Sequence, residues 1–475
     1  EFGVKDWIFY ASGGGTRTGD YNTPAGRIEN SATEMKQATG GFGRYSEKFS
    51  FNVGYGLQEG IYGVPVNPDD EDHDEDAHGL RGSVMARAVR STSLLAPRDE
   101  ADGHDEEHHH HGPVTLKWRR HNTRFHGVVR DLGPFVEQLQ LSAGYTDWNH
   151  TEMEGAEVGT RFFNKQFVYR GTFTQRRKGR LDGSFGFWGM TRRFDAQGAE
   201  AIAPKVSQNS IALFALEEVS LERVRLQFGG RLENNRYSPN GLPSRSFTGA
   251  SGSAGIFVPL WKDGAAVLNY MHSYRAPSLE ELFNNGPHPG NAVFEVGNAN
   301  LRRERSDGVD LAIRHRGRRI RLETNLFRYQ MHDFVYFQPT GEEDDGFPVA
   351  EYRQADARFT GAEARLEASL HSSLWLLLGF DAVDAHITSS RQNLPRIPPA
   401  RGRLGFDYRY KGLSVRPELV LANRQWQIAP IETPTAGYAV MNINASYTWA
   451  SQHLMHTISA NRSEERRVGK ECRSR

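Results

Sequence analysis

Apolar and polar residues alternate with a period of two along much of this chain. The alternation is clearest in the stretches 224–233, 362–370, 403–410 and 441–449. In the last of these, Met441, Ile443 and Tyr447 share one face of an extended strand, while asparagine, serine and threonine occupy the other. One face of each stretch therefore suits lipid or an apolar core, and the opposite face suits water.

The connections between these stretches alternate between long and short. The long ones cover about 62–112, 152–160, 195–208, 236–246, 274–302, 337–350, 386–398 and 426–437. The short ones lie near 133–134, 176–180, 220–223, 259–264, 315–319, 371–374, 411–412 and 451–453. A soluble sandwich or propeller also has alternating strands, but short turns on one side and long loops on the other are typical of outer-membrane barrels. We therefore predict an all-β fold, an antiparallel transmembrane β-barrel.

The composition agrees with a barrel. Hydrophobic residues make up only 37% of the 475 residues, and glycine is frequent at 49. No run approaches the roughly 18 consecutive apolar residues of a membrane helix. The formal charge is zero, so nothing points to a nucleic-acid partner, and the single cysteine, Cys472, excludes a disulfide within the chain.

The pattern yields about 19 strands, whereas bacterial barrels have an even number. The chain also opens without the basic and then apolar leader of an exported protein. We therefore expect a fragment that lacks opening strands and one closing strand. The final residues, 462–475, show no alternation and resemble a translated sequencing adapter more than a genuine basic tail. We expect this tail to be non-native and unpaired.

The longest connection carries the strongest chemical signal. Between residues 69 and 111 lie seven of the chain's 18 histidines, together with thirteen acidic residues and four arginines. The histidines are His73, His78, His104, His108, His109, His110 and His111. Imidazole and carboxylate groups together suit Zn²⁺. The alternatives are a solvated polar loop and an affinity tag. Because no metal-finger spacing occurs, the tract is interpreted as a low-affinity metal collector.

One segment matches a known family. Residues 273–283 read Ser-Tyr-Arg-Ala-Pro-Ser-Leu-Glu-Glu-Leu-Phe, and Gly-Pro-His-Pro at 286–289, Phe-Glu-Val-Gly-Asn at 294–298 and Glu-Arg-Ser at 304–306 follow. These motifs, with Phe-Thr-Gly-Ala-Glu at 359–363 and the proline-rich stretch 394–401, resemble the barrel of TonB-dependent receptors. The step Tyr-Gly-Val-Pro at 62–65, followed by the acidic and histidine-rich tract, is most similar to the zinc receptor group.

The resemblance covers nearly all of residues 1–461 and implies a partial barrel of the 22-stranded type. The loop 62–112 belongs to that barrel, and the family's N-terminal plug is absent. It also implies a Gram-negative outer-membrane transporter, not an enzyme. The expected partners are outer-membrane lipid, a metal ion as cargo, and the TonB complex, which acts through the missing plug. No resident cofactor is implied. His150, Glu152 and His288 occupy positions similar to ligand-bearing segments of the zinc group and are candidate ligands.

Other cargoes remain open within this family. A ferric siderophore or cobalamin is the main alternative to zinc. Copper would favour methionine clusters, and the eight methionines of this chain form none in the tract. A passive porin or adhesin is the alternative of another class, against which the family-like segment around 274–306 argues. No nucleophile–base pair or phosphate-binding loop suggests an enzyme.

Overall fold

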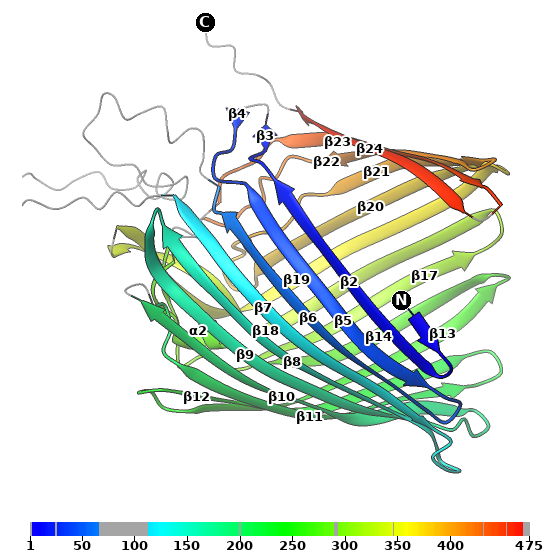
Figure 1. Ribbon diagram of the computed structural model, residues 1–475, viewed down its shortest axis with the longest axis horizontal. Helices are drawn as coiled ribbons and strands as arrows, with labels where there is room; N and C mark the ends of the chain where they lie inside the picture. Colours follow the sequence, from blue (N-terminus) through cyan, green and yellow to red (C-terminus); the bar gives the residue numbers. More distant parts are fainter. Residues whose placement is uncertain are drawn as a thin grey trace, which may run out of the picture.

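A computed structural model of the chain describes residues 2–23, 26–65, 113–198, 201–288, 293–344, 346–430, 432–452 and 454–468. Within these ranges the protein is a single large sheet whose strands slant around a hollow interior, with one helix, α2 (Leu279–Phe283), and a small separate β3–β4 hairpin (Figure 1). In the part of the chain so described, no helix is long and apolar enough to cross a membrane.

The strands and their bounds are β1 (Phe2–Val4), β2 (Trp7–Thr18), β3 (Asn22–Thr23), β4 (Gly26–Arg27), β5 (Thr33–Tyr45), β6 (Phe49–Gly63), β7 (Val114–Arg130), β8 (Val136–Glu154), β9 (Glu157–Gln175), β10 (Leu181–Gly198), β11 (Val206–Ser220), β12 (Arg225–Pro239), β13 (Arg245–Trp261), β14 (Gly264–Arg275), β15 (Asn285–His288), β16 (Val293–Val296), β17 (Glu304–Arg316), β18 (Ile320–Asp344), β19 (Phe347–His371), β20 (Leu374–Ile387), β21 (Arg401–Tyr410), β22 (Leu413–Ala422), β23 (Gly437–Ala450) and β24 (Met455–Val468).

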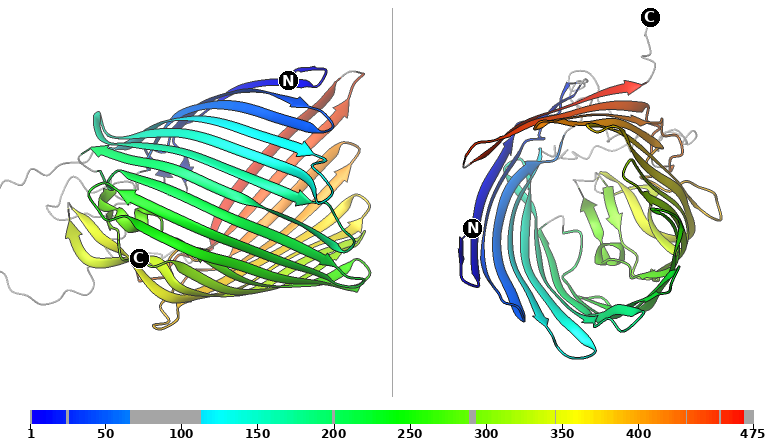
Figure 2. Two further views of the ribbon diagram at one scale, coloured as in Figure 1. Left: turned by 90° about the horizontal axis from the view of Figure 1, so that it is seen from below. Right: turned by 90° about the vertical axis from the view of Figure 1, so that its right-hand side faces the viewer.

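The wall is antiparallel throughout and follows chain order. β2 pairs with β5, each later wall strand pairs with the next, and β14 pairs with β17 across the inserted α2, β15 and β16. Nineteen of the described wall strands contain ten or more residues, and the short β1 lies beside β2. The end view in Figure 2 shows these strands curving around a lumen. The prediction of an antiparallel β-barrel with about 19 strands is confirmed.

Each wall strand presents one apolar and one polar face, as the alternation predicts. On β11 and β12, Leu213, Phe228 and Leu232 are 60%, 47% and 61% exposed on the outer face. The neighbouring Asn235 and Tyr237 are buried on the opposite face, where Tyr237 contacts the segment that fills the barrel mouth. An outer band of exposed apolar side chains around a polar interior is the arrangement that a lipid bilayer requires.

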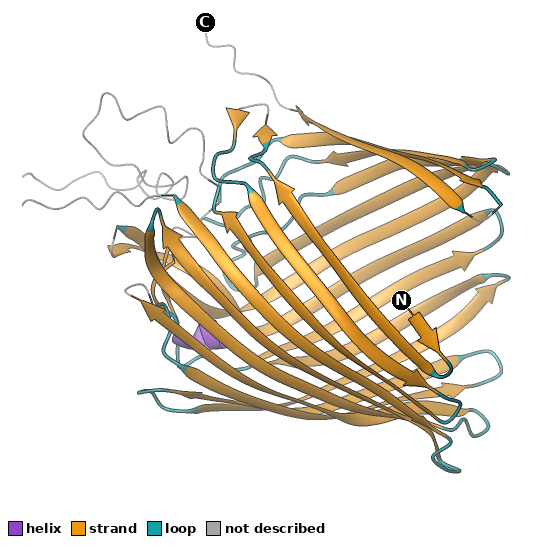
Figure 3. Ribbon diagram, in the orientation of Figure 1, coloured by secondary structure: helices purple, strands orange, loops and turns teal. Residues whose placement is uncertain are grey.

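The two rims of the barrel differ, as the connection lengths predict (Figure 3). At one rim the hairpins are tight, and β21 turns into β22 through Lys411 and Gly412 alone. Both residues have positive φ, 45° and 85°, which is the backbone of a type I′ turn and explains the glycine.

The prediction of a long loop at the other rim is wrong for two regions. The region 152–160 is a tall hairpin, because β8 continues to Glu154 and β9 begins at Glu157. The region 337–350 is likewise occupied by β18 and β19. Ladder hydrogen bonds satisfy the backbone equally well above a membrane, so polar strands continue beyond the lipid and the hydrophobic pattern does not mark their ends.

The expectation of an unpaired tail from residue 462 is also wrong for its first seven residues. β24 extends to Val468 and pairs with β23 in register from Ala450↔Met455 to Gly437↔Val468. Antiparallel pairing needs only backbone donors and acceptors, so a polar sequence can continue a ladder that an alternating one began. Residues 469–475 lie outside the described residues, and the non-native origin of 462–475 stays a prediction.

Candidate metal-binding site at the barrel mouth

The chain between β14 and β17 folds into the lumen at the long-loop rim instead of extending from it (Figure 2). Its helix α2 is short and begins with a capping box, in which Ser278 accepts from the Glu281 amide at 3.2 Å and Glu281 accepts from the Ser278 amide at 2.7 Å. Leu279, Leu282 and Phe283 are buried against the inner wall. The helix therefore packs its apolar side chains into the barrel mouth, and this packing determines where the following residues lie.

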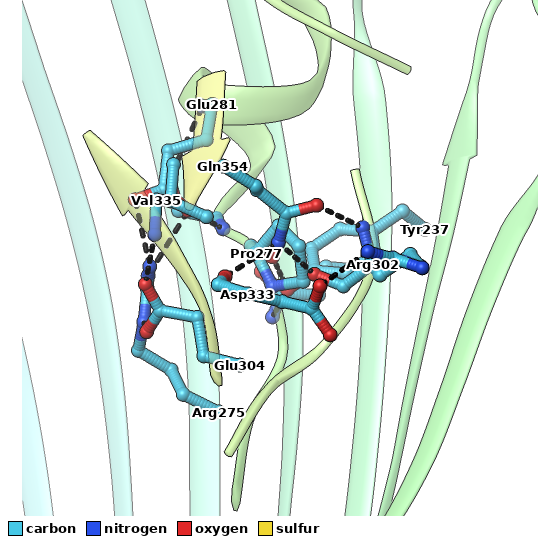
Figure 4. Close-up of polar contacts among 11 residues, drawn as sticks. Tyr237, Arg275, Pro277, Glu281, Arg302, Glu304, Asp333, Val335 and Gln354 are labelled. Atoms are coloured by element: carbon cyan, nitrogen blue, oxygen red, sulfur yellow. Dashed lines mark hydrogen bonds and ion pairs between the residues drawn. The ribbon is translucent and has the colours of Figure 1, made fainter. Parts of the chain in front are cut away.

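An ionic contact between a partly exposed arginine and two less exposed carboxylates holds the beginning and end of this mouth segment together (Figure 4). Arg275, the last residue of β14, binds both carboxylate oxygens of Glu281 at 3.0 Å and also pairs with Glu304, the first residue of β17. Glu304 is only 3% exposed and also accepts from the Val335 amide at 2.6 Å. A charge this deeply buried is tolerated only because it is paired and hydrogen-bonded.

Further hydrogen bonds attach the mouth segment to the wall (Figure 4). The Tyr237 hydroxyl donates to the Pro277 carbonyl at 2.8 Å. Gln354 accepts from the Arg302 amide at 2.8 Å and donates to the Arg302 carbonyl at 2.7 Å, while the Arg302 side chain pairs with Asp333. These contacts involve β12, β18 and β19, so the segment is held from several directions.

Within the mouth segment, the β15–β16 hairpin carries a histidine and a glutamate on adjacent strands. Gly286 pairs with Glu295, and β16 lies parallel to β19. The His288 Nδ1 donates to Glu295 Oε1 at 2.9 Å, and the Asn284 amide donates to Glu295 Oε2 at 2.8 Å. Glu295 is only 5% exposed. Its hydrogen bond with Nδ1 fixes the orientation of the His288 imidazole.

The wall contributes a second histidine and glutamate from the upper end of β8. His150 and Glu152 are two residues apart on the lumen face, with His150 Nε2 3.9 Å from Glu152 Oε1. Glu152 is 7% exposed. The His150 ring stacks on Phe162 at 4.3 Å, and its Nδ1 is buried without a hydrogen-bond partner among the described residues. A buried nitrogen without a partner is rare in proteins and often marks a functional site.

The structure places these two pairs within electrostatic range of each other. His288 lies close enough to Glu152 for that carboxylate to act on the charge of the imidazole. Within the described residues, however, no three His, Cys, Asp or Glu side chains are grouped closely enough to hold a metal ion as they stand. The two pairs are therefore a partial ligand set, which an ion would have to draw together or which other groups would complete.

The contact with Glu295 favours the protonated form of His288. The hydrogen bond from His288 raises the pKa of its imidazole above the ordinary 6.5, and the charges of Glu295 and Glu152 add to it while burial opposes it. A raised pKa means that the protonated pair stabilises the fold below pH 6.5, and that this stability is lost as pH rises through the folded-state pKa.

We expect this linkage to appear in heat-denaturation midpoints. The denaturation midpoint of the wild type should exceed that of His288→Asn by a larger margin at pH 6 than at pH 9, because the asparagine side-chain nitrogen takes the place of Nδ1 and only the charge is lost. The control substitution is His386→Asn, since His386 also uses Nδ1 and its partner at 3.0 Å, Asp384, has a side chain that is 47% exposed and therefore screened by water. A margin for His288→Asn that is constant with pH would contradict the ion pair.

The seven histidines of the tract, from His73 to His111, lie outside the described residues. Its two ends are described: the Val64 amide donates to the Val114 carbonyl at 2.9 Å, and the Gly155 amide donates to the Pro113 carbonyl at 3.2 Å. The tract therefore leaves and re-enters the wall beside the β8–β9 turn. Antiparallel pairing from β8 to β14 puts this turn and the mouth segment at the same rim.

Sequence reasoning selected His150, Glu152 and His288 but missed Glu295. That residue belongs to one of the family-like motifs, Phe-Glu-Val-Gly-Asn, yet nothing local distinguishes it from an exposed strand carboxylate. The one available signal is its position between Val293 and Gly297, where the other residues are apolar. A lone carboxylate in such a setting requires a buried partner.

Comparisons with known proteins agree with this architecture. The family model of the TonB dependent receptor-like β-barrel matches residues 5–461. Among solved structures, the copper transporter OprC has a TM-score of 0.75 at 16% identity, over 94% of this chain and 70% of that one. The FrpB iron transporter from Neisseria meningitidis (F3-3 variant) scores 0.67 at 11% identity, over 93% and 70%. The Serratia marcescens hemophore receptor HasR, solved with its hemophore and heme, scores 0.69 at 13%, over 94% and 72%. At these identities the likeness shows the fold alone.

Proposed function

The chain belongs to the TonB-dependent receptors, which are outer-membrane transporters and not enzymes, and from this premise we propose that its cargo is a zinc ion. The observation that carries the proposal is that the pair His150 and Glu152 lies within electrostatic range of the pair His288 and Glu295 in the barrel mouth. Imidazole nitrogen and carboxylate oxygen are the ligands of zinc sites outside the cysteine-rich class.

The donor types favour zinc over copper(I). OprC is a copper transporter and FrpB an iron transporter; copper(I) favours methionine sulfur, and none of the four described donors is a methionine. The mouth pairs are half to fully buried and offer two imidazoles. A bulky chelate would instead need a wide vestibule lined by aromatic and arginine side chains.

The orientation of His288 supports direct coordination. Because Nδ1 donates to Glu295, the imidazole would present Nε2 to an ion, and a carboxylate behind a ligating histidine raises its basicity. On the opposite side, the Nδ1 of His150 lies buried without a hydrogen-bond partner in the described part of the chain.

The acidic and histidine-rich tract would act before this site. Seven imidazoles among thirteen carboxylates raise the local concentration of divalent cations. Ordering a chain segment around one ion costs about 1–2 kcal/mol per residue fixed, so several weak and exchanging sites are expected. Since the tract's ends lie beside the mouth, released ions would reach His150 and His288 over a short path.

Deletion of residues 69–111 from the full-length receptor tests whether the tract collects zinc and the barrel mouth binds it afterwards. We expect impaired zinc uptake when zinc is scarce and near-normal uptake when it is abundant. Capture by the tract should also fade as pH falls through about 6.5, because imidazoles bind metal only when neutral. The measurement is uptake of radioactive zinc into cells against zinc concentration at pH 7.5 and pH 5.5.

A matched control replaces the seven histidines of the tract by asparagine and keeps its length and carboxylates. This variant should lose most of the advantage at scarce zinc if imidazole is the capturing group. Unchanged zinc uptake by the deletion variant at every zinc concentration would show that the tract is a solvated loop with no role in uptake. Equal loss at all concentrations would make it the principal site, and normal uptake of iron chelates or cobalamin with no zinc uptake would refute the cargo.

A further inference from the structure

The outer face of the wall changes character along a sharp line across β14, β17, β18, β19 and β20, which lie side by side (Figure 1). One row of cross-strand neighbours consists of Leu268, Leu311, Leu326, Ala362 and Ala382 and is wholly apolar. Four residues along each strand toward the long-loop rim, on the same face, the cross-strand neighbours are His272, Asp307, Gln330, Arg358 and His386. The boundary of the lipid therefore falls between these rows.

A groove of about 860 Å³ crosses this boundary on the outer face. Its floor is apolar, with Leu311 and Leu326, and its upper edge contains Arg328. Across the groove the chain that follows β22 supplies Arg424 and Trp426. The indole of Trp426 is 62% exposed, and the Arg424 guanidinium lies 3.9 Å from its ring centroid. Tryptophan at this level is typical of the membrane interface.

The charges at this edge are not balanced within the protein. Asp384, which also lines the groove, interacts through its carboxylate with His386 at 3.0 Å. Asp307 accepts from Tyr270 at 2.6 Å and contacts His272 at 2.9 Å. By contrast, the guanidinium groups of Arg328 and Arg424 take part in no ion pair or hydrogen bond within the described residues, although the Arg424 backbone amide donates to the Asn423 side chain at 2.8 Å. The nearby acids are thus already occupied, and two guanidinium groups remain for an external anion.

We propose that this groove is a binding site for a phosphorylated lipid of the outer leaflet, with the acyl chains on the apolar floor and a headgroup phosphate between Arg328 and Arg424. Position favours this occupant: the groove opens toward the bilayer at the depth where lipid headgroups meet acyl chains. A guanidinium binds phosphate through parallel N–H donors. The site lies on the opposite face of the wall from the metal ligands and is independent of the cargo.

The test uses the full-length receptor, extracted in mild detergent, depleted of lipid and mixed with diphosphorylated lipid A. Native mass spectrometry measures the bound fraction. Each of Arg328→Gln and Arg424→Gln should weaken binding about fivefold, and the double variant about 25-fold, from the roughly 1 kcal/mol that one basic side chain contributes at an anionic surface. Zinc uptake by the double variant should be unchanged.

The matched control is Arg236→Gln, because Arg236 is also exposed on the outer face but lies outside the groove. It should leave lipid binding unchanged. Lipid A without phosphates should bind the wild type as weakly as diphosphorylated lipid A binds the double variant, and inorganic phosphate should not displace the lipid. The proposal would be overturned if Arg236→Gln weakened lipid binding as much as the groove variants do. It would also be overturned if the wild type bound lipid A equally well with and without its phosphates. Trp426→Ala should weaken both lipids.

Discussion

Zinc binding is expected to fall by more than 100-fold when His288 is replaced by alanine in the receptor that lacks residues 69–111. The tract is removed so that its weak sites do not contribute to the measurement. The imidazole is expected to be a direct ligand, and the loss should exceed the roughly 10–100-fold cost of losing an outer-shell partner. Glu295→Gln, which removes only that partner, should fall within the 10–100-fold range. Isothermal titration with zinc at pH 7.5 measures both.

His272→Ala is the matched control for this experiment. His272 contacts Asp307 at 2.9 Å, the same separation as between His288 and Glu295, but it lies on the outer face of the wall. Its loss should leave zinc affinity unchanged. If His288→Ala and His272→Ala had the same affinity as the parent, the barrel mouth would not be the zinc site, even if the tract deletion impaired uptake.

Replacing Arg275 by methionine is expected to open the mouth segment. The substitution leaves Glu304, which is 3% exposed, without its cationic partner. Breaking a fully buried pair from one side costs about 3–5 kcal/mol, and water around the Arg275 side chain, which is 44% exposed, should reduce that cost. Hydrogen exchange at the amides of residues 276–288 should therefore accelerate by at least about tenfold, if the segment opens as a unit. Exchange followed by mass spectrometry measures this directly.

The control for the mouth segment is Arg302→Gln. Arg302 pairs with Asp333, but its side chain is 74% exposed, and exposed pairs contribute about 0–1 kcal/mol. Exchange should therefore change by a few-fold at most. Zinc binding should weaken in Arg275→Met, because the segment positions His288 and Glu295. Equal exchange in the two arginine variants would show that the contacts of Arg275 with Glu281 and Glu304 do not hold the segment.

Much of the wall follows from local chemistry in the sequence. The pleat of a strand sends successive side chains to opposite faces, so the alternation alone assigns Phe228 and Leu232 to one face and Arg231 to the other. Lys411-Gly412 indicates a two-residue turn, because such a turn needs the positive φ that glycine adopts without strain. The ends of the strands are not predictable in this way: β8 and β18 continue past the lipid, and β24 continues to Val468, because backbone pairing has no hydrophobic requirement.

The mouth of the barrel required the tertiary structure. The capping box at Ser278 and the burial of Leu279, Leu282 and Phe283 were found in the structure, and no local pattern in the sequence indicates that the segment turns inward. Glu295 looks like a surface carboxylate until the wall encloses it. His150 and His288 are 138 positions apart in the chain, and only the curvature of the wall from β8 to β14 brings their segments to one place.

What the sequence by itself determined is therefore the class of fold, the family, the two faces of each strand and the chemistry available in the acidic and histidine-rich tract. These depend on residues close together in the chain. What only the tertiary structure decided is which donors meet, which arginines lack a partner among the described residues, and where the lipid boundary crosses the wall. Those properties depend on strand register and on the inward fold of residues 276–288 and 293–303, and both are set by contacts between residues far apart in the chain.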